Sequence, residues 1–200
     1  MSANTLTNNK VNVPDSLGNV PDSLGNVPDS LGNDSDSLGI AVLTVSDSRS
    51  LETDDSGTAL IEALQSGGHT LVERNLVKDD KHLIRAQICN WVIDASVEVI
   101  ITTGGTGFTG RDSTPEALAP LFDKTIDGFG ELFRHVSFEE IGPSTVQSRA
   151  LGGLIHTTLV FALPGSPNAV KTAWDKMLRH QLDSTSRPCN FAQLIARFGE

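Results

Sequence analysis

The chain has 200 residues, of which 38% are hydrophobic and 20% charged, and its formal net charge is −10. This composition predicts one globular domain with an ordinary core and excludes a membrane-spanning helix, because no apolar run approaches 18 residues. The acidic balance argues against nucleic-acid binding, so an anionic ligand would have to be attracted locally. The chain has two distant cysteines and no apolar leader, so we expect a cytoplasmic protein with reduced thiols.

Residues 12–39 carry a seven-residue repeat, with three copies of NVPDSLG followed by NDSDSLG. The proline in each of the first three copies excludes a coiled coil, because it would break a helix. The Gly and Asp-Ser of every copy favour turns. We therefore expect residues 1–39 to be a disordered tail, with partner docking through the Val and Leu of each copy as the alternative.

After this tail, segments of strand and helix character alternate along the chain. The patterns predict strands at 40–46, 69–77, 97–103 and within 154–163. They predict helices at 56–66, 81–95, 115–122, 128–140, 144–150 and 168–181. The glycine pair at 67–68 is expected to end the helix at 56–66, and the pair at 152–153 to break the chain. The alternation indicates an α/β fold with a mainly parallel sheet flanked by helices.

The run VEVIITTGGTGFTGRDSTPEAL at 97–118 joins a buried strand to a glycine-rich turn and a helix start. The glycines at 104, 105 and 107 let the backbone approach a ligand and direct N–H groups at an anion. Asp112 follows beside Arg111. Thr114 precedes Pro115, an arrangement typical of an N-cap and a first helical residue. A carboxylate beside an anion cradle predicts a metal–phosphate site.

Four polar or glycine-containing loops follow the predicted strands, at 46–49, 78–80, 103–112 and 164–167. Parallel α/β sheets bind ligands beyond the carboxyl ends of their strands, so these loops are expected to converge. Two of them supply spare carboxylates, Asp79 and Asp112. This convergence predicts a phosphorylated ligand with a divalent cation.

Each of these residues also has a structural interpretation. Asp112 can cap a turn, Asp79 can be a solvated acid at a strand end, and Asp80 is expected to cap the helix at 81–95. Asp47 either contacts the ligand or closes its loop, and Arg111 either pairs with Asp112 or reaches a phosphate. The five histidines show no metal-ligand spacing and are expected to be exposed or partly buried.

The string TTGGTGFTGRDSTPEAL closely resembles the signature of the MoaB/MogA molybdopterin-binding family. The resemblance runs from about residue 40 to the C-terminus. It continues in GFGELFRHVSFEEIG, STVQSRALGG, FALPGSPNAV and RPCNF, which look most like the B-type branch. It implies a molybdopterin-binding fold, a three-layer sandwich, for residues 40–200.

The resemblance also implies a site. Active members hold Mg²⁺ with two aspartates, one in an "xPD" loop and one in the "RD" after the glycines. Asp79 in VKDD and Asp112 in GRD match these positions, although Lys78 replaces the family's proline. The residues expected to bind the substrates are Ser46, Asp47, Thr103, Gly104, Gly105, Thr106, Gly107, Arg111, Ser137, Pro164 and Gly165.

The implied activity is adenylylation of molybdopterin by ATP with Mg²⁺, which releases pyrophosphate. Two alternatives stay open: a catalytically silent protein that carries molybdopterin, and a nucleotide or pyrophosphate hydrolase. Family members are typically trimers, sometimes paired into hexamers. We therefore expect a homotrimer or homohexamer, with the helical region 128–150 as a candidate contact, and neither a nucleic-acid nor a membrane partner.

Overall fold

The computed structural model describes residues 36–200. Nearly all of the predicted repeat-bearing tail, residues 1–35, lies outside the described residues, so the expectation of disorder stays a prediction. Within the described part of the chain, none of the helices is long and apolar enough to cross a membrane.

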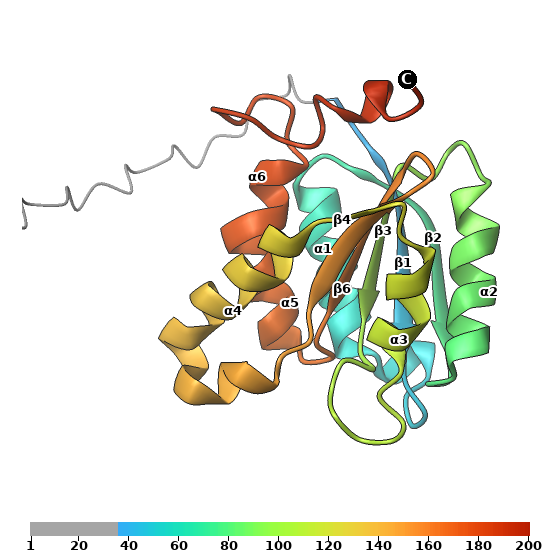
Figure 1. The fold of residues 1–200 in the computed structure, drawn as a ribbon, viewed down its shortest axis with the longest axis vertical. Helices are drawn as coiled ribbons and strands as arrows, with labels where there is room; N and C mark the ends of the chain where they lie inside the picture. The colour runs from blue at the N-terminus through green and yellow to red at the C-terminus, as the bar shows by residue number, and fades with distance from the viewer. Residues whose placement is uncertain (1–35) are drawn as a thin grey trace, which may run out of the picture. The chain divides into compact units, whose positions relative to one another are not determined.

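Six strands form a single sheet in the order β2-β1-β3-β6-β5-β4 (Figure 1). The strands are β1 (Gly39–Val45), β2 (Thr70–Val77), β3 (Val99–Thr103), β4 (Lys124–Thr125), β5 (Leu151–Ile155) and β6 (Thr158–Leu163). Strands β1, β2, β3 and β6 pair in parallel, whereas β5 pairs antiparallel with both of its neighbours, β6 and β4. The mainly parallel sheet is thus confirmed, and β2 lies at one of its edges.

Helices cover both faces of this sheet. The α-helices are α1 (Asp55–Ser66), α2 (Lys81–Val92), α3 (Thr114–Leu118), α4 (Asp127–Ile141), α5 (Pro167–Ala173) and α6 (Arg179–Gln181). Shorter 3₁₀ turns are η1 (Leu51–Thr53), η2 (Ala119–Leu121), η3 (Gly142–Gln147) and η5 (Ile195–Arg197), and η4 (Trp174–Leu178) is π-helical. In Figure 1, α2 and α3 lie on one side of the strands and α1, α4 and α5 on the other.

The core is correspondingly split into two clusters, one on each face of the sheet. Leu60, Phe133 and Val170 belong to the cluster beneath α1, α4 and α5, and Ile84 and Leu118 to the cluster beneath α2 and α3. Strand β3 is buried along its whole length because it lies between these clusters. This arrangement confirms the three-layer α/β fold.

The sequence predicted a break in the chain at the glycine pair 152–153. The structure instead places both glycines within β5. A Cβ on Gly153 would lie 2.4 Å from the Phe122 ring, and one on Gly152 would lie 2.9 Å from the Phe161 ring. These positions are glycine because the aromatic rings occupy the space of a side chain. The predicted strand within 154–163 is therefore part of a hairpin formed by β5 and β6.

Several predicted boundaries also need correction. Thr114 is the first residue of α3 instead of its cap, and its hydroxyl donates to the Gly104 carbonyl at 3.0 Å. The segment predicted as a helix at 144–150 is mostly the 3₁₀ turn η3. His69 is buried, contrary to expectation. Asp80 does cap α2, where its carboxylate accepts from the N–H groups of residues 82 and 83.

Candidate functional site

The glycine loop after β3 packs against the loop after β6. Gly104 has φ of 101° and Gly105 has φ of 63°, a region that glycine adopts without strain. The Gly104 N–H donates to the Leu163 carbonyl at 3.0 Å, and a Cβ on Gly165 would lie 3.1 Å from the Gly104 Cα. These two loops therefore meet at the carboxyl ends of their parallel strands, as the sequence analysis predicted.

Asp79, at the end of β2, lies against the same glycine loop. Its side chain is buried, and its Oδ1 accepts from the Ser113 N–H at 2.9 Å and the Ser113 hydroxyl at 2.6 Å. Its Oδ2 lies 2.7 Å from the position that a Cβ of residue 105 would occupy. The absence of a side chain at Gly105 thus leaves room for this carboxylate.

Asp112 lies against the same loop at Gly107. Its Oδ2 accepts from the Thr109 hydroxyl at 2.6 Å and the Thr109 N–H at 2.8 Å, and lies 2.7 Å from the Cβ position of residue 107. The Thr109 hydroxyl, aided by backbone N–H groups and Arg149, lowers the pKa of Asp112 although burial opposes this. Asp112 therefore caps the turn at Thr109, as one interpretation predicted, and the same hydrogen bonds orient its carboxylate.

Arg111 pairs with Asp47, and not with the neighbouring Asp112. The two guanidinium nitrogens lie 2.9 and 2.6 Å from the Asp47 carboxylate oxygens. This hydrogen bonding lowers the pKa of Asp47. Asp47 also accepts the Asp79 N–H at 3.3 Å, so it closes its loop onto both neighbouring loops.

Three predicted hydroxyl groups have different surroundings. The Ser46 Oγ accepts from the N–H groups of Ser48 and Arg49 at 3.3 and 3.1 Å, so it stabilises its own loop. The Thr103 hydroxyl donates to the Pro164 carbonyl at 3.1 Å. Thr106 is buried and lines a cavity beside the glycine loop, so it is the one of the three that faces a candidate ligand space.

This cavity has a volume of about 410 Å³ and is bordered by the two loops, α4, η3 and α5. The predicted site residues that line it are Gly104, Gly105, Thr106, Gly107, Asp112, Ser137, Pro164 and Gly165. The predicted residues outside its lining are Ser46, Asp47, Thr103, Asp79 and Arg111. The predicted residues thus form two groups. One group lines the cavity, and the other consists of charged and hydroxyl-bearing side chains outside its lining.

The sequence analysis predicted Ser137 on α4 but missed Glu140 and its two partners on α5, which line the same cavity. Glu140 lines it from the end of α4 and accepts from Asn168 at 2.6 Å and from Thr172 at 2.8 Å. Both donors belong to α5. No sequence signal marks this group, because helical residues on two separate elements meet only after folding.

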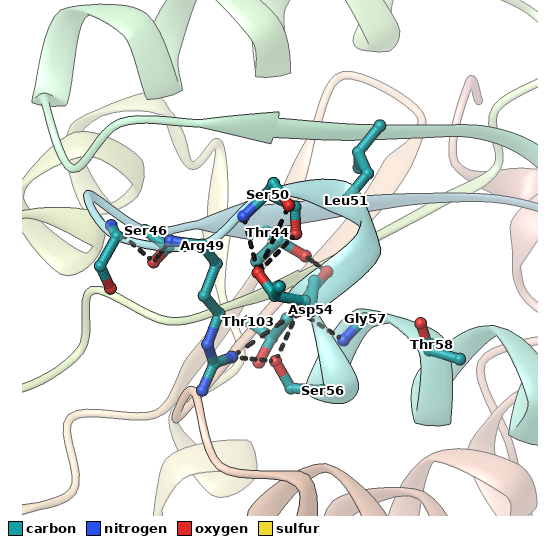
Figure 2. A network of polar contacts seen from close by, with 12 residues as sticks. Thr44, Ser46, Arg49, Ser50, Leu51, Asp54, Ser56, Gly57, Thr58 and Thr103 are labelled. Atoms are coloured by element: carbon teal, nitrogen blue, oxygen red, sulfur yellow. Dashed lines mark hydrogen bonds and ion pairs between the residues drawn. The ribbon is translucent and has the colours of Figure 1, made fainter.

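A buried acid that the sequence analysis did not single out supports the loop after β1. Figure 2 shows Arg49 extending toward Ser56 and Asp54 at the N-terminus of α1. Asp54 accepts from the Thr44 hydroxyl at 2.5 Å and the Gly57 N–H at 3.0 Å. Burial opposes ionisation, but these bonds and those from Arg74 and Ser56 lower the pKa of Asp54. The N-cap rule applied one residue before α1 would have found it.

Arg149 holds the glycine loop from outside. Its Nε donates to the Thr106 carbonyl at 3.3 Å and its Nη2 to the Asp112 carbonyl at 2.9 Å. It also pairs with Glu116, and its guanidinium lies 5.0 Å from the centre of the Phe108 ring. One side chain therefore ties both ends of the segment 106–112.

Two aspartates bordering one glycine loop are suited to a hard cation such as Mg²⁺, which uses one or two carboxylates together with substrate phosphates and water. Because residues 105 and 107 are glycines, the carboxylate oxygens of Asp79 and Asp112 can lie close to the loop backbone. Among residues 36–200 no group of three or more His, Cys, Asp or Glu side chains is arranged to hold a metal ion. A cation here would therefore need ligands from its substrate.

Known proteins resemble this chain in both sequence and fold. The family described as "Probable molybdopterin binding domain" matches residues 41–184. Molybdenum cofactor biosynthesis protein B of Escherichia coli K12 is 51% identical over 152 residues, which are 76% of this chain and 89% of that protein.

Two solved structures share the fold. A crystal structure of a molybdenum cofactor biosynthesis protein B, 39% identical, has a TM-score of 0.75 over 82% of this chain and 97% of its own. The tungsten cofactor synthesizing protein MoaB from Pyrococcus furiosus, 40% identical, has a TM-score of 0.64 over 70% of this chain and 90% of its own.

Proposed function

The chain belongs to the family of probable molybdopterin binding domains, and from this premise we propose that it adenylylates molybdopterin with MgATP. Its role lies in molybdenum cofactor biosynthesis, with molybdopterin as its ligand. The observation that carries the proposed activity is the placement of Asp79 and Asp112 against one glycine loop.

In the proposed reaction, the terminal phosphate of molybdopterin attacks the α-phosphate of ATP. A new phosphate–phosphate linkage forms, the bond between the α- and β-phosphates breaks, and pyrophosphate leaves with its electron pair. The nucleophile is already an anion, so no general base is needed. The protein has to position the two phosphates in line and offset their charge.

The residues divide this work between them. Asp79 and Asp112 would hold Mg²⁺, which when bound neutralises phosphate charge. The N–H groups of the segment 104–107 would bind phosphate oxygens, and the Thr106 hydroxyl would donate to one of them. Arg111 would contribute positive charge from the edge of the site.

The test is formation of adenylyl-molybdopterin by the purified protein with ATP and Mg²⁺. We expect Asp79→Ala and Asp112→Ala to abolish product formation while largely preserving molybdopterin binding. Asp127→Ala, at an exposed acid in the first turn of α4, is the matched control and should retain activity. Wild-type protein that binds molybdopterin without forming product would be a carrier, and ATP consumption without molybdopterin would indicate a hydrolase.

The assembly is a further part of the proposal. Exposed apolar side chains gather on α4 and η3, namely Leu132, Phe138, Ile141 and Val146. An interface at this region would cover them, in a homotrimer or a homohexamer. Light scattering that gives a monomer mass at micromolar concentration would contradict this assignment. We also propose a cytoplasmic location, since both Cys89 and Cys189 are free thiols.

A further inference from the structure

The charged side chains that line the cavity beside the glycine loop are all acidic. Its lining includes two carboxylates, Asp112 beside the glycine loop and Glu140 at the end of α4. Among the described residues that line it, none is Lys, Arg or His. A phosphate at the Asp112 end can be accommodated by backbone N–H groups and a cation. The Glu140 end has no such compensation, so it favours a ligand that presents N–H donors.

The Glu140 carboxylate is held in place by α5. Its Oε1 accepts from the Thr172 hydroxyl at 2.8 Å, and its Oε2 accepts from the Asn168 amide at 2.6 Å. Asn168 and Thr172 are four residues apart on one helix and so present their donors on the same face. Each carboxylate oxygen can accept at least one further bond. The pair of oxygens is thus oriented and still able to accept two parallel N–H donors.

A buried hydroxyl lies beside this acceptor pair. Ser137 precedes Glu140 by three residues on α4, so the two share a helix face, and Ser137 also lines the cavity. A hydroxyl next to a carboxylate offers one donor and two acceptors in sequence. This pattern complements a ring edge that carries one carbonyl oxygen followed by two N–H groups.

We propose that Glu140 determines specificity for the pterin by accepting the N3–H and the 2-amino N–H of its 2-amino-4-oxo edge. The Ser137 hydroxyl donates to the 4-oxo group beside them. The adenine edge of ATP places an acceptor nitrogen next to its amino group, which a carboxylate repels, so the nucleotide does not occupy this end. The inference rests on the proposed function and adds to it the residue that recognises the pterin ring.

The test compares two fluorescent ligands with identical phosphorylated side chains, neopterin monophosphate and the matching lumazine. The lumazine carries an oxygen in place of the 2-amino group. Titration of the wild-type protein should give at least about tenfold tighter binding of the pterin, as expected for a charge-assisted hydrogen bond replaced by a repulsion. In Glu140→Gln this ratio should fall to about threefold or less through weaker pterin binding.

Glu139→Gln is the matched control, because Glu139 is adjacent to Glu140 and exposed like it, but does not line the cavity. It should keep the wild-type ratio. Lumazine binding reports on the fold of each variant and should not weaken in Glu140→Gln. Equal affinities for the two ligands in the wild type, an unchanged ratio in Glu140→Gln, or no binding of either ligand would overturn the proposal.

The same protein samples separate this inference from the proposed reaction. If the wild type discriminates between pterin and lumazine but forms no adenylyl product, then adenylyl transfer fails and the role of Glu140 stands. If product forms and Glu140→Gln retains the wild-type ratio, then the reaction stands and the recognition role fails.

Discussion

Arg111 and Asp47 are 64 residues apart in the sequence and form a two-point ion pair with N–O distances of 2.9 and 2.6 Å. The pair joins the loop after β3 to the loop after β1. Asp47 in turn accepts the N–H of Asp79 at the end of β2. A single exposed carboxylate thereby links the loops that follow three neighbouring strands, and its charge is offset by Arg111 next to the proposed phosphate site.

Removal of this cation should affect ligand binding more than folding. In Arg111→Ala the Asp47 charge is left unpaired beside Asp79, so we expect the KM for ATP to rise several-fold. The unfolding midpoint should change little, because exposed ion pairs contribute little to stability. Steady-state kinetics at two ionic strengths measures the effect, which should shrink at high salt. Arg197→Ala, which removes the exposed pair with Glu200, is the control and should leave KM unchanged.

Asp54 should be important for stability. Its side chain is buried and accepts hydrogen bonds from Thr44, Ser56, Gly57 and Arg74. Asp54→Asn replaces an acceptor oxygen by a donor and leaves Arg74 without its charge partner. We expect the free energy of unfolding to fall by about 2–3 kcal/mol in urea denaturation. Asp55→Asn, at the exposed first residue of α1, should cost well under half as much.

The same carboxylate predicts a pH dependence. The pKa of Asp54 is lower in the folded state than its ordinary value. Its contribution to stability is therefore complete above the ordinary aspartate pKa and is lost as the pH falls through the lower folded value, below about pH 4. Urea midpoints measured from pH 7 to pH 3 should fall more steeply in the wild type than in Asp54→Asn. Parallel curves would contradict the assignment.

Gly107 should be required for the position of the Asp112 carboxylate. A Cβ there would lie 2.7 Å from the Asp112 Oδ2, so Gly107→Ala has to displace this side chain from its bonds with Thr109. We expect the Mg²⁺ concentration for half-maximal activity to rise by about tenfold or more, the scale of losing an oriented metal ligand. Gly110→Ala is the control, because nothing lies within 4 Å of its added methyl group.

Arg149 should maintain the loop through its shape as well as its charge. Its guanidinium bonds the carbonyls of Thr106 and Asp112 and pairs with Glu116. Lysine has one ammonium group and cannot make these bonds together. We therefore expect Arg149→Lys to resemble Arg149→Ala, with faster amide exchange in 106–112 and a higher Mg²⁺ concentration for half-maximal activity. Full rescue by lysine would show that charge alone is sufficient.

The sequence alone determined those features whose causes are local. The β-branched run of β3, the glycines after it and the Asp80 cap of α2 act over a few residues, so these local features could be predicted correctly. The cavity residues from the glycine loop and from Pro164-Gly165 followed from the same reasoning, because carboxyl ends of parallel strands share one edge of the sheet. The signature string at 102–118 is by itself sufficient to identify the family.

Tertiary structure decided which side chains meet across elements. Arg149 reaches back 43 residues to Thr106 and 37 residues to Asp112, and no pattern in either segment marks the other. The partner of Arg111 and the pairing of Glu140 with α5 depend likewise on how loops and helices pack. Gly152 and Gly153 entered a strand because neighbouring aromatic rings fill the space above them. Local propensity does not predict such contacts, since they form only when distant segments pack together.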